Sequence, residues 1–295
     1  MPRSSPQDEI DSGSASVASD RINKGDQMKQ SYDGKTVWIT GGGSGFGREL
    51  ALQYAHLGAQ VAVSGRRADR LDDTVRAIQG QGGSGLAVPC DVGQEEQIAS
   101  AMNLIIDRFG SLDVAVANAA FPASGKVEAL EAGDWRRQFE VNVIGAAMTA
   151  KHALPELRKS KGRLALVGSA ACLAPVPMYG AYCASKYALR AIGQTLAMEL
   201  HGSGVSCTVL YPGYMDTEFS QIDDEGHFDP NKDHVVNPFM YSTEKGAKLS
   251  IRAIYKRKRE YAFSPFGKVF CCLGAHTPGL FHFLITRFGA PGIPE

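Results

Sequence analysis

A glycine-rich loop near the start of the chain joins a short apolar segment to an amphipathic one. Residues 35–40 have the β-branched and aromatic content of a buried strand, and the loop 41–47 follows at once. Backbone without side chains can approach a pyrophosphate closely, and the first-turn amides and dipole of a following helix favour its charge. This order therefore predicts a nucleotide site on an α/β fold. The helix should end at Gly58, after the apolar positions Leu50, Leu52, Ala55 and Leu57.

Further apolar runs along the chain fit the same fold. They are continuous rather than alternating, as expected for strands of a sheet that is buried on both faces. We predict a Rossmann-type, doubly wound parallel sheet in one domain, with its ligand at the carboxyl ends of the strands. A chain of 295 residues is long enough for one such domain with a full core. The five runs are residues 61–63, 86–88, 114–116, 164–167 and 205–210.

Tyr182 and Lys186 lie four residues apart, a spacing that places them on one face of a helix. A free phenol has a pKa of about 10 and exchanges protons poorly at neutral pH. A nearby ammonium stabilises the phenolate, so Lys186 is expected to lower the pKa of Tyr182 toward the range of general acid–base catalysis. The same spacing also occurs in ordinary exposed contacts, so the assignment depends on the rest of the chain.

Together these motifs resemble the single-domain branch of the short-chain dehydrogenase/reductase superfamily. The resemblance covers roughly residues 33–263, in the family's order of motifs. Ser169 precedes Tyr182 by the family's usual thirteen residues, whereas Ala120 departs from the family, which commonly has glycine there. The other matching segments are Thr40-Gly41-Gly42-Gly43-Ser44-Gly45-Phe46-Gly47, Asp91-Val92, Asn118-Ala119-Ala120, Asn142, and Pro212-Gly213 followed by Thr217.

The resemblance implies an enzyme that interconverts a carbonyl and a secondary or primary alcohol by hydride transfer with a nicotinamide cofactor. In reduction Tyr182 would donate the proton, Ser169 would hydrogen-bond the carbonyl oxygen and Asn142 would help hold a water relay. Lys186 would serve both the phenol and the nicotinamide ribose. The alternative is a non-catalytic NADP(H)-binding sensor or scaffold, which would have no need to keep all four groups. Implied cofactor contacts are Gly41, Gly43, Ser44, Gly45, Phe46, Gly47, Asp91, Val92, Asn118, Lys186, Pro212, Gly213 and Thr217.

The end of the second predicted strand indicates which cofactor is preferred. Gly65 occupies the position of the acidic residue that would bind an NAD ribose, and Arg66 and Arg67 follow it. Without a carboxylate to repel the 2′-phosphate, and with an arginine to grip it, NADP(H) should bind better than NAD(H). We expect Arg66 to make the stronger contact. The alternative is that both arginines are solvated at a helix start.

The segment 214–241 is expected to govern the choice of substrate, because the family varies its substrate there. It mixes apolar and acidic residues, which suits a mobile lid with an apolar inner face and modestly favours a hydrophobic substrate. An ordinary long surface loop is the alternative. Tyr214 at its start is assigned to the substrate pocket, and Tyr179 upstream is assigned to the pocket or to a structural contact.

The two ends of the chain differ from the predicted catalytic domain, residues 32–263. Residues 1–31 are poor in large apolar groups and are predicted to be a disordered tail, in which Met28 is a candidate alternative start. Residues 264–295 form an apolar extension after the basic run 256–259. The extension would pack on its own domain or a partner subunit, or would rest on a membrane surface as part of a lipid-ketone reductase.

Composition indicates the setting in which the predicted enzyme acts. The 31 basic and 31 acidic residues balance, which argues against nucleic acid as a partner. The six cysteines and seven histidines lack ligand spacing, so we predict no metal site. A reduced, cytoplasmic protein is the expectation, peripheral to a membrane if the extension binds lipid. We also expect a homo-oligomer that acts on a small-molecule carbonyl or alcohol.

Overall fold

The computed structural model describes residues 31–223, 227–231 and 240–289. The predicted N-terminal tail lies outside the described residues except for Ser31. Residues 224–226 and 232–239 of the predicted substrate segment, and 290–295 of the extension, also lie outside them.

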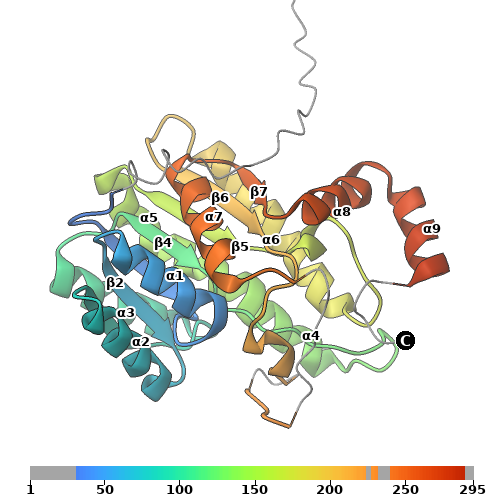
Figure 1. Ribbon diagram of the computed structural model, residues 1–295, viewed down its shortest axis with the longest axis horizontal. Coiled ribbons are helices and arrows are strands. Elements are labelled where there is room, and N and C mark those ends of the chain that lie inside the picture. The colour runs from blue at the N-terminus through green and yellow to red at the C-terminus, as the bar shows by residue number, and fades with distance from the viewer. Residues whose placement is uncertain (1–30, 224–226, 232–239, 290–295) are drawn as a thin grey trace, which may run out of the picture. The chain divides into compact units, whose positions relative to one another are not determined.

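A parallel sheet of seven strands forms the centre of the described chain, in the order β3-β2-β1-β4-β5-β6-β7 (Figure 1). The order reverses between β1 and β4, and this switch point is where such sheets bind ligands. The doubly wound parallel fold is thus confirmed. The seventh strand was not predicted, because its three residues are only half-buried and form no apolar run. The strands are β1 Thr36–Thr40, β2 Gln60–Gly65, β3 Ser84–Pro89, β4 Val114–Ala117, β5 Arg163–Val167, β6 Ser206–Tyr211 and β7 Glu260–Ala262.

Helices cover both faces of the sheet, and strand β1 shows how. Val37 and Ile39 pack into the core beneath α1 and α7, which lie side by side, whereas Trp38 packs into the opposite core beneath α3, α5 and α6 (Figure 1). Successive strand side chains point to opposite faces, so a continuous apolar strand fills both cores. The helices are α1 Gly45–His56, α2 Ala68–Gly80, α3 Glu95–Phe109, α4 Ala132–Phe139, α5 Ala146–Ser160, α6 Gly180–Glu199, α7 Thr243–Tyr255, α8 Pro265–His276 and α9 Pro278–Phe288.

Within the described residues, three short helical segments occur between these elements. They are the π-helical η2 Glu140–Gly145 and the 3₁₀ segments η3 Ala170–Cys172 and η4 Glu218–Gln221.

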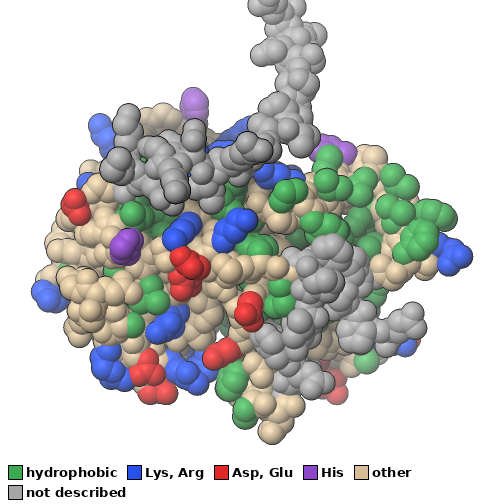
Figure 2. Space-filling view, in the orientation of Figure 1, with side chains coloured by type: hydrophobic (Ala, Val, Ile, Leu, Met, Phe, Trp, Pro, Cys, Tyr) green, Lys and Arg blue, Asp and Glu red, His purple; other side chains and the backbone are tan. Residues whose placement is uncertain are grey.

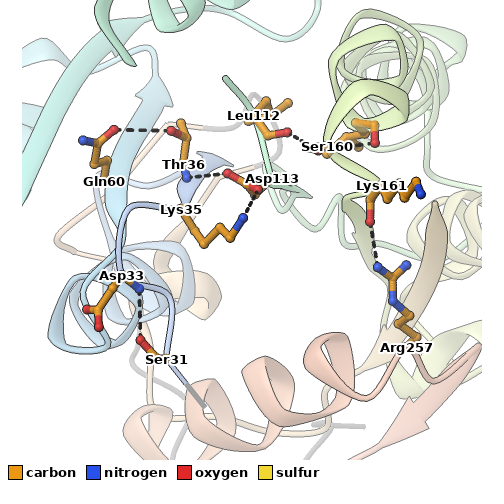
Figure 3. A network of polar contacts seen from close by, with 11 residues as sticks. Ser31, Asp33, Lys35, Thr36, Gln60, Leu112, Asp113, Ser160, Lys161 and Arg257 are labelled. Carbon is orange, nitrogen blue, oxygen red and sulfur yellow. Dashed lines mark hydrogen bonds and ion pairs between the residues drawn. The ribbon is translucent and has the colours of Figure 1, made fainter. Parts of the chain in front are cut away.

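A polar network ties the strands together at the amino end of the sheet (Figure 3). The buried Asp113 carboxylate accepts from the backbone N–H of Thr36 at 3.0 Å and pairs with Lys35 Nζ at 3.0 Å. Arg257 donates to the carbonyl oxygen of Lys161 at 2.7 Å and to that of Gly204 at 2.8 Å. The contacts of Asp113 hold the starts of β1 and β4 in register. Arg257, a member of the basic run 256–259, has a structural role.

The C-terminal extension forms two helices, of which α8 packs on the catalytic domain and α9 packs on α8. Ser264 caps α8 by accepting from the backbone N–H of Gly267 at 2.8 Å. Cys271 is buried with Cys172 next to η3, and a side chain at Gly274 would overlap the carbonyl oxygen of Leu173. The extension therefore contacts its own domain directly behind the loop that carries Ser169.

Candidate active site

The glycine loop is packed so tightly that a side chain at Gly41 or Gly47 would collide with neighbouring backbone. Gly41 has a left-handed backbone (φ +67°), and a Cβ there would lie 2.9 Å from the Cα of Ala119. A Cβ at Gly47 would overlap the carbonyl oxygen of Gly41, so α1 starts directly against the loop. Ser44 precedes α1 without capping it through its side chain. The first-turn amides of α1 thus border the cavity, where they can receive a phosphate group.

Asn118 holds this loop in place from the end of β4. Its side-chain amide donates to the carbonyl oxygen of Thr40 at 2.9 Å and to that of Gly41 at 3.3 Å. The Thr40 hydroxyl in turn accepts from the backbone amides of Asn118 at 3.0 Å and Ala119 at 3.1 Å. Asn118 also lines the cavity, as does Ala120. Both hydrogen bonds of the Asn118 side-chain amide are made to the start of the glycine loop, so Asn118 positions this loop.

The second strand ends in a basic corner of the cavity. Arg66 and Arg67 both line it, but it is Arg67 that donates to the Ser44 hydroxyl, at 3.0 Å. Arg66 is the more exposed of the two. Arg70, one turn further along α2, also lines the cavity and was not predicted. Its spacing from Arg67 on a helix start was the signal that could have found it. These guanidinium groups can hold a phosphate monoester.

Asp91 and Val92 follow β3 and form the next wall of the cavity. The Asp91 carboxylate accepts from the backbone N–H of Gly93 at 2.9 Å, which fixes the turn. Val92 is buried, and a Cβ at Gly145 would lie 2.8 Å from its carbonyl oxygen. This wall of the cavity is therefore tightly packed; its contact with an adenine ring stays a prediction.

Tyr182 and Lys186 lie on one face of α6, as their spacing predicted. The Lys186 Nζ atom is 5.6 Å from the centroid of the Tyr182 ring and donates to the carbonyl oxygen of Val167 at 3.0 Å. Ser169, on the loop after β5, makes a side-chain hydrogen bond with Tyr182. All three side chains line the same cavity as the glycine loop. The structure thus brings together groups that are 145 positions apart in sequence, from Gly41 to Lys186.

The electrostatics of this cluster differ from the expectation. Burial raises the pKa of Tyr182 well above its usual value, and the hydrogen bond with Ser169 opposes only part of that shift. Burial also lowers the pKa of Lys186 to about 8, because the protein around it disfavours the ammonium. The prediction that Lys186 lowers the pKa of Tyr182 is therefore wrong for the protein groups by themselves, because burial outweighs the other influences. At neutral pH the phenol is protonated and can donate a proton.

Asn142 lies in the π-helical segment η2, which the sequence did not predict. Its amide donates to the carbonyl oxygen of Phe121 at 3.1 Å and to the Ser185 hydroxyl at 3.2 Å, and its oxygen accepts from Phe121 N–H at 3.2 Å. Ser185 donates to the Tyr182 carbonyl oxygen at 2.7 Å. Asn142 is buried and is not among the residues that line the cavity, so it positions α6 from behind; its role in a water relay stays a prediction.

The far end of the cavity is aromatic. The whole cavity has a volume of about 820 Å³, which lies within the usual range of ligand sites. Tyr179 and Phe219 pack against the Tyr182 ring, with centroids 6.3 and 6.0 Å away. Burial raises the pKa of Tyr214, on the same wall, to about 12. Tyr179 and Tyr214 thus both line this end of the cavity, and their contact with a substrate stays a prediction.

The segment after β6 closes the cavity between its two ends. Pro212 accepts from the backbone N–H of Ala170 at 2.9 Å through its carbonyl oxygen. Thr217 caps η4 by accepting from Phe219 N–H at 3.3 Å, and its Cβ would be 3.4 Å from a Cβ at Gly45. Pro212, Gly213 and Thr217 therefore border both the Ser169 loop and the glycine loop.

Helix α8 supplies a wall that sequence reasoning missed. Phe266, Gly267 and Phe270, at helical spacing on one face, line the aromatic end. The helical spacing of the apolar residues could have predicted an apolar face on α8. The sequence does not indicate which part of the protein this helix face packs against. Among the described residues, no cluster of three His, Cys, Asp or Glu side chains is placed to hold a metal ion.

Comparisons with known proteins agree with this geometry. Residues 35–226 match the model of the short chain dehydrogenase family. The 11-beta-hydroxysteroid dehydrogenase 1A of Arabidopsis thaliana is 33% identical over 242 residues, 79% of this chain and 68% of that protein. The 3beta-hydroxysteroid dehydrogenase of Mediterraneibacter gnavus is 30% identical over 201 residues, 68% of this chain and 73% of that protein.

Two solved structures are similar in fold and hold nicotinamide nucleotides. A short chain dehydrogenase/reductase from Burkholderia phymatum in complex with NAD has a TM-score of 0.76 and 25% identity, over 90% of this chain and 99% of that one. An alcohol dehydrogenase from Thermococcus sibiricus complexed with 5-hydroxy-NADP has a TM-score of 0.68 and 27% identity, over 77% and 95%. This chain therefore belongs to the short-chain dehydrogenase/reductase family, oxidoreductases that act on CH–OH groups.

Proposed function

We propose that this protein is an NADP(H)-dependent oxidoreductase that interconverts a bulky hydrophobic ketone and its alcohol. One observation carries the proposal: a single cavity has a glycine loop and three arginines at one end, Tyr182, Ser169 and Lys186 in the middle, and aromatic side chains at the other end. A non-catalytic sensor would need only the first of these three parts.

The residues at the glycine end fit a nicotinamide dinucleotide phosphate. Backbone amides at the start of α1 face the cavity without a side-chain cap, as a pyrophosphate requires. The corner formed by Arg67 and Ser44 is cationic and pre-ordered by their 3.0 Å hydrogen bond. Gly65 contributes no carboxylate to repel a 2′-phosphate. When bound, the nicotinamide supplies or accepts the hydride.

The chain's own groups handle the proton and the oxygen of the substrate. Tyr182 is neutral at pH 7 because burial raises its pKa, so it is in the form that donates a proton to a carbonyl oxygen. Ser169, already hydrogen-bonded to Tyr182, can donate to the same oxygen. Lys186 keeps its ammonium beside the phenol and stabilises negative charge there as the proton leaves. A protonated phenol is the form that serves the reduction of a carbonyl.

The aromatic end determines the class of substrate. The side chains of Tyr179, Tyr214, Phe219, Phe266 and Phe270 line this end, and an aromatic lining suits a flat, apolar molecule. Two relatives are named as hydroxysteroid dehydrogenases, which supports a steroid-sized ketone as the first compound to test.

A panel of ketones tests the proposal directly. Oxidation of NADPH and of NADH is followed with steroid, retinoid, sphingoid and small aliphatic carbonyls. We expect turnover with at least one bulky ketone, and a higher kcat/KM with NADPH than with NADH. Binding of NADPH without turnover of any carbonyl would support the sensor instead, and a preference for NADH would overturn the cofactor assignment.

A further inference from the structure

The exposed apolar surface of the described chain is concentrated on its last two helices. Ten large hydrophobic side chains are exposed, and five of them lie on α8 and α9, which are only 12 and 11 residues long. Figure 2 shows the hydrophobic side chains gathered where Figure 1 draws these helices. Scattered exposed apolar residues are normal, but a contiguous group indicates a binding surface. The five are Phe266, Val269, Leu280, Phe283 and Phe288.

The charges on this surface have one sign. Between residues 264 and 289 there is no Asp or Glu, whereas Lys268 and Arg287 are both present. The whole chain has equal numbers of acidic and basic residues, so this bias is local. Lys258 extends it, because its Nζ lies 5.1 Å from the Tyr261 ring centroid while that of Lys268 lies 5.9 Å from the same ring. A surface that is apolar and cationic complements an anionic lipid interface.

The geometry suits a surface that lies on a bilayer. Within the described residues no single helix is long and apolar enough to cross a membrane, and α8 and α9, which pass that test together, are bent by 118° at their junction. Each helix is roughly 16–18 Å long, about half of a hydrocarbon core. Their inner faces are taken by the protein itself, since Phe270 and Phe281 pack edge to face at 5.0 Å and Cys271 is buried. The outer faces are left for another partner.

We propose that the outer face of α8 and α9 is a lipid-binding surface that holds the protein on membranes containing anionic lipids. A second copy of the chain fits this face less well. Two such surfaces facing each other would bring Lys268 and Arg287 of both copies together with no carboxylate between residues 264 and 289 to balance them. A layer of lipid headgroups supplies the negative charge, and the acyl chains beneath it receive Leu280 and Phe283.

The lipid surface is continuous with the cavity. Phe266 is exposed on α8 and also lines the aromatic end, and Phe270 lines the cavity while it packs on α9. A hydrophobic ketone could therefore move from lipid to Tyr182 along apolar side chains. This consequence rests on the proposed function; the docking itself does not.

Vesicle flotation of the full chain tests the docking without any substrate. Phosphatidylcholine vesicles with and without about one-third phosphatidylserine are the probes. We expect the protein to float with the anionic vesicles, and the double variant Leu280→Glu/Phe283→Glu to lower its partition coefficient by at least about tenfold. The matched control is Leu104→Glu/Met198→Glu, two equally apolar and exposed positions on α3 and α6. It should float like the wild type.

Two further variants keep the test decisive. Val269→Glu changes α8 alone, so that a folding defect on α9 cannot be mistaken for lost docking. This variant should bind vesicles more weakly and should turn over a water-soluble ketone at an unchanged rate. Arg287→Gln should reduce the preference for phosphatidylserine several-fold. The proposal is overturned if the wild type does not float or if the control variant loses binding equally. It is also overturned if the wild type is a dimer that does not bind vesicles and light scattering shows that Leu280→Glu/Phe283→Glu dissociates this dimer. NADPH-dependent turnover is measured separately, so its absence would refute the proposed function alone.

Discussion

The two ends of the cavity are built in different ways. In the glycine loop, a Cβ added at Gly41 or Gly47 would collide with neighbouring backbone, and Asn118 holds the loop by hydrogen bonds. At the proposed substrate end, the wall has aromatic side chains from the start of α6, the segment after β6, η4 and α8, which are far apart in sequence. The glycine loop leaves no room for a side chain, whereas the aromatic wall can change one side chain at a time. Binding of the cofactor and choice of substrate are therefore separable by mutation.

The largest effect is expected between the two ends, at Tyr182. Tyr182→Phe keeps the ring and its packing on Phe219 but removes the proton. Turnover should fall by on the order of a hundred- to ten-thousand-fold, because a positioned acid or base supplies about that much. Affinity for NADPH, measured by fluorescence titration, should be nearly unchanged. Near-normal turnover would mean that another group donates the proton.

Gly65→Asp should change only the cofactor end. A Cβ at Gly65 would meet only Leu71, at 3.6 Å, so the aspartate fits without strain. Its carboxylate would repel a 2′-phosphate and accept hydrogen bonds from a free ribose hydroxyl, which contribute roughly 1.5–3 kcal/mol. The ratio of kcat/KM for NADPH to that for NADH should fall by about tenfold or more. An unchanged ratio would show that Arg67 and Arg70 do not contact the phosphate.

Lys186→Met tests the buried ammonium through stability. The folded-state pKa of Lys186, about 8, lies below the pKa of an unfolded lysine. Between these two pKa values the unfolded chain therefore binds more protons than the folded chain. Lys186 should therefore make the wild type more stable as pH rises above 8. Between pH 7 and 9 its free energy of unfolding should increase by about 1 kcal/mol relative to that of Lys186→Met, measured by urea denaturation. A constant difference would show that Lys186 is not desolvated.

The smallest effect is expected at the substrate end. Phe266→Ala removes one aromatic group from the cavity wall, and the KM for a bulky ketone should rise about three- to tenfold, since one such contact contributes roughly 1 kcal/mol. The affinity for NADPH should stay the same. Phe283→Ala is the matched control, because Phe283 is exposed and does not line the cavity. If both variants or neither raised KM, α8 would not form the substrate wall.

The order of the strands and the position of the glycine loop could be predicted, because both depend on local sequence patterns. The strands are continuous apolar runs, and the loop between β1 and α1 is a run of glycines that a close approach requires. Tyr182 and Lys186 fall on one helix face by their spacing alone. These features depend on neighbours within a few residues, so they can be recognised without knowing what packs against them.

Other features depend on segments that meet only in the folded chain. The pKa of Tyr182 is raised because protein surrounds it, and the sequence alone suggested the opposite direction. Asn142 is turned toward Phe121 and Ser185 by a π-helical turn that no local pattern indicated. Strand β7 forms because β6 offers it a free edge, although its own residues are half-buried.

By itself, the sequence determined the sheet, the glycine loop and the Tyr-Lys pair, because backbone geometry and side-chain period set them locally. The tertiary structure decided which arginine contacts Ser44, how strongly Tyr182 and Lys186 are desolvated, and that α8 lines the aromatic end of the cavity. Desolvation and the enclosure of a cavity are sums over many atoms from distant segments, and they have no value until those segments are packed together.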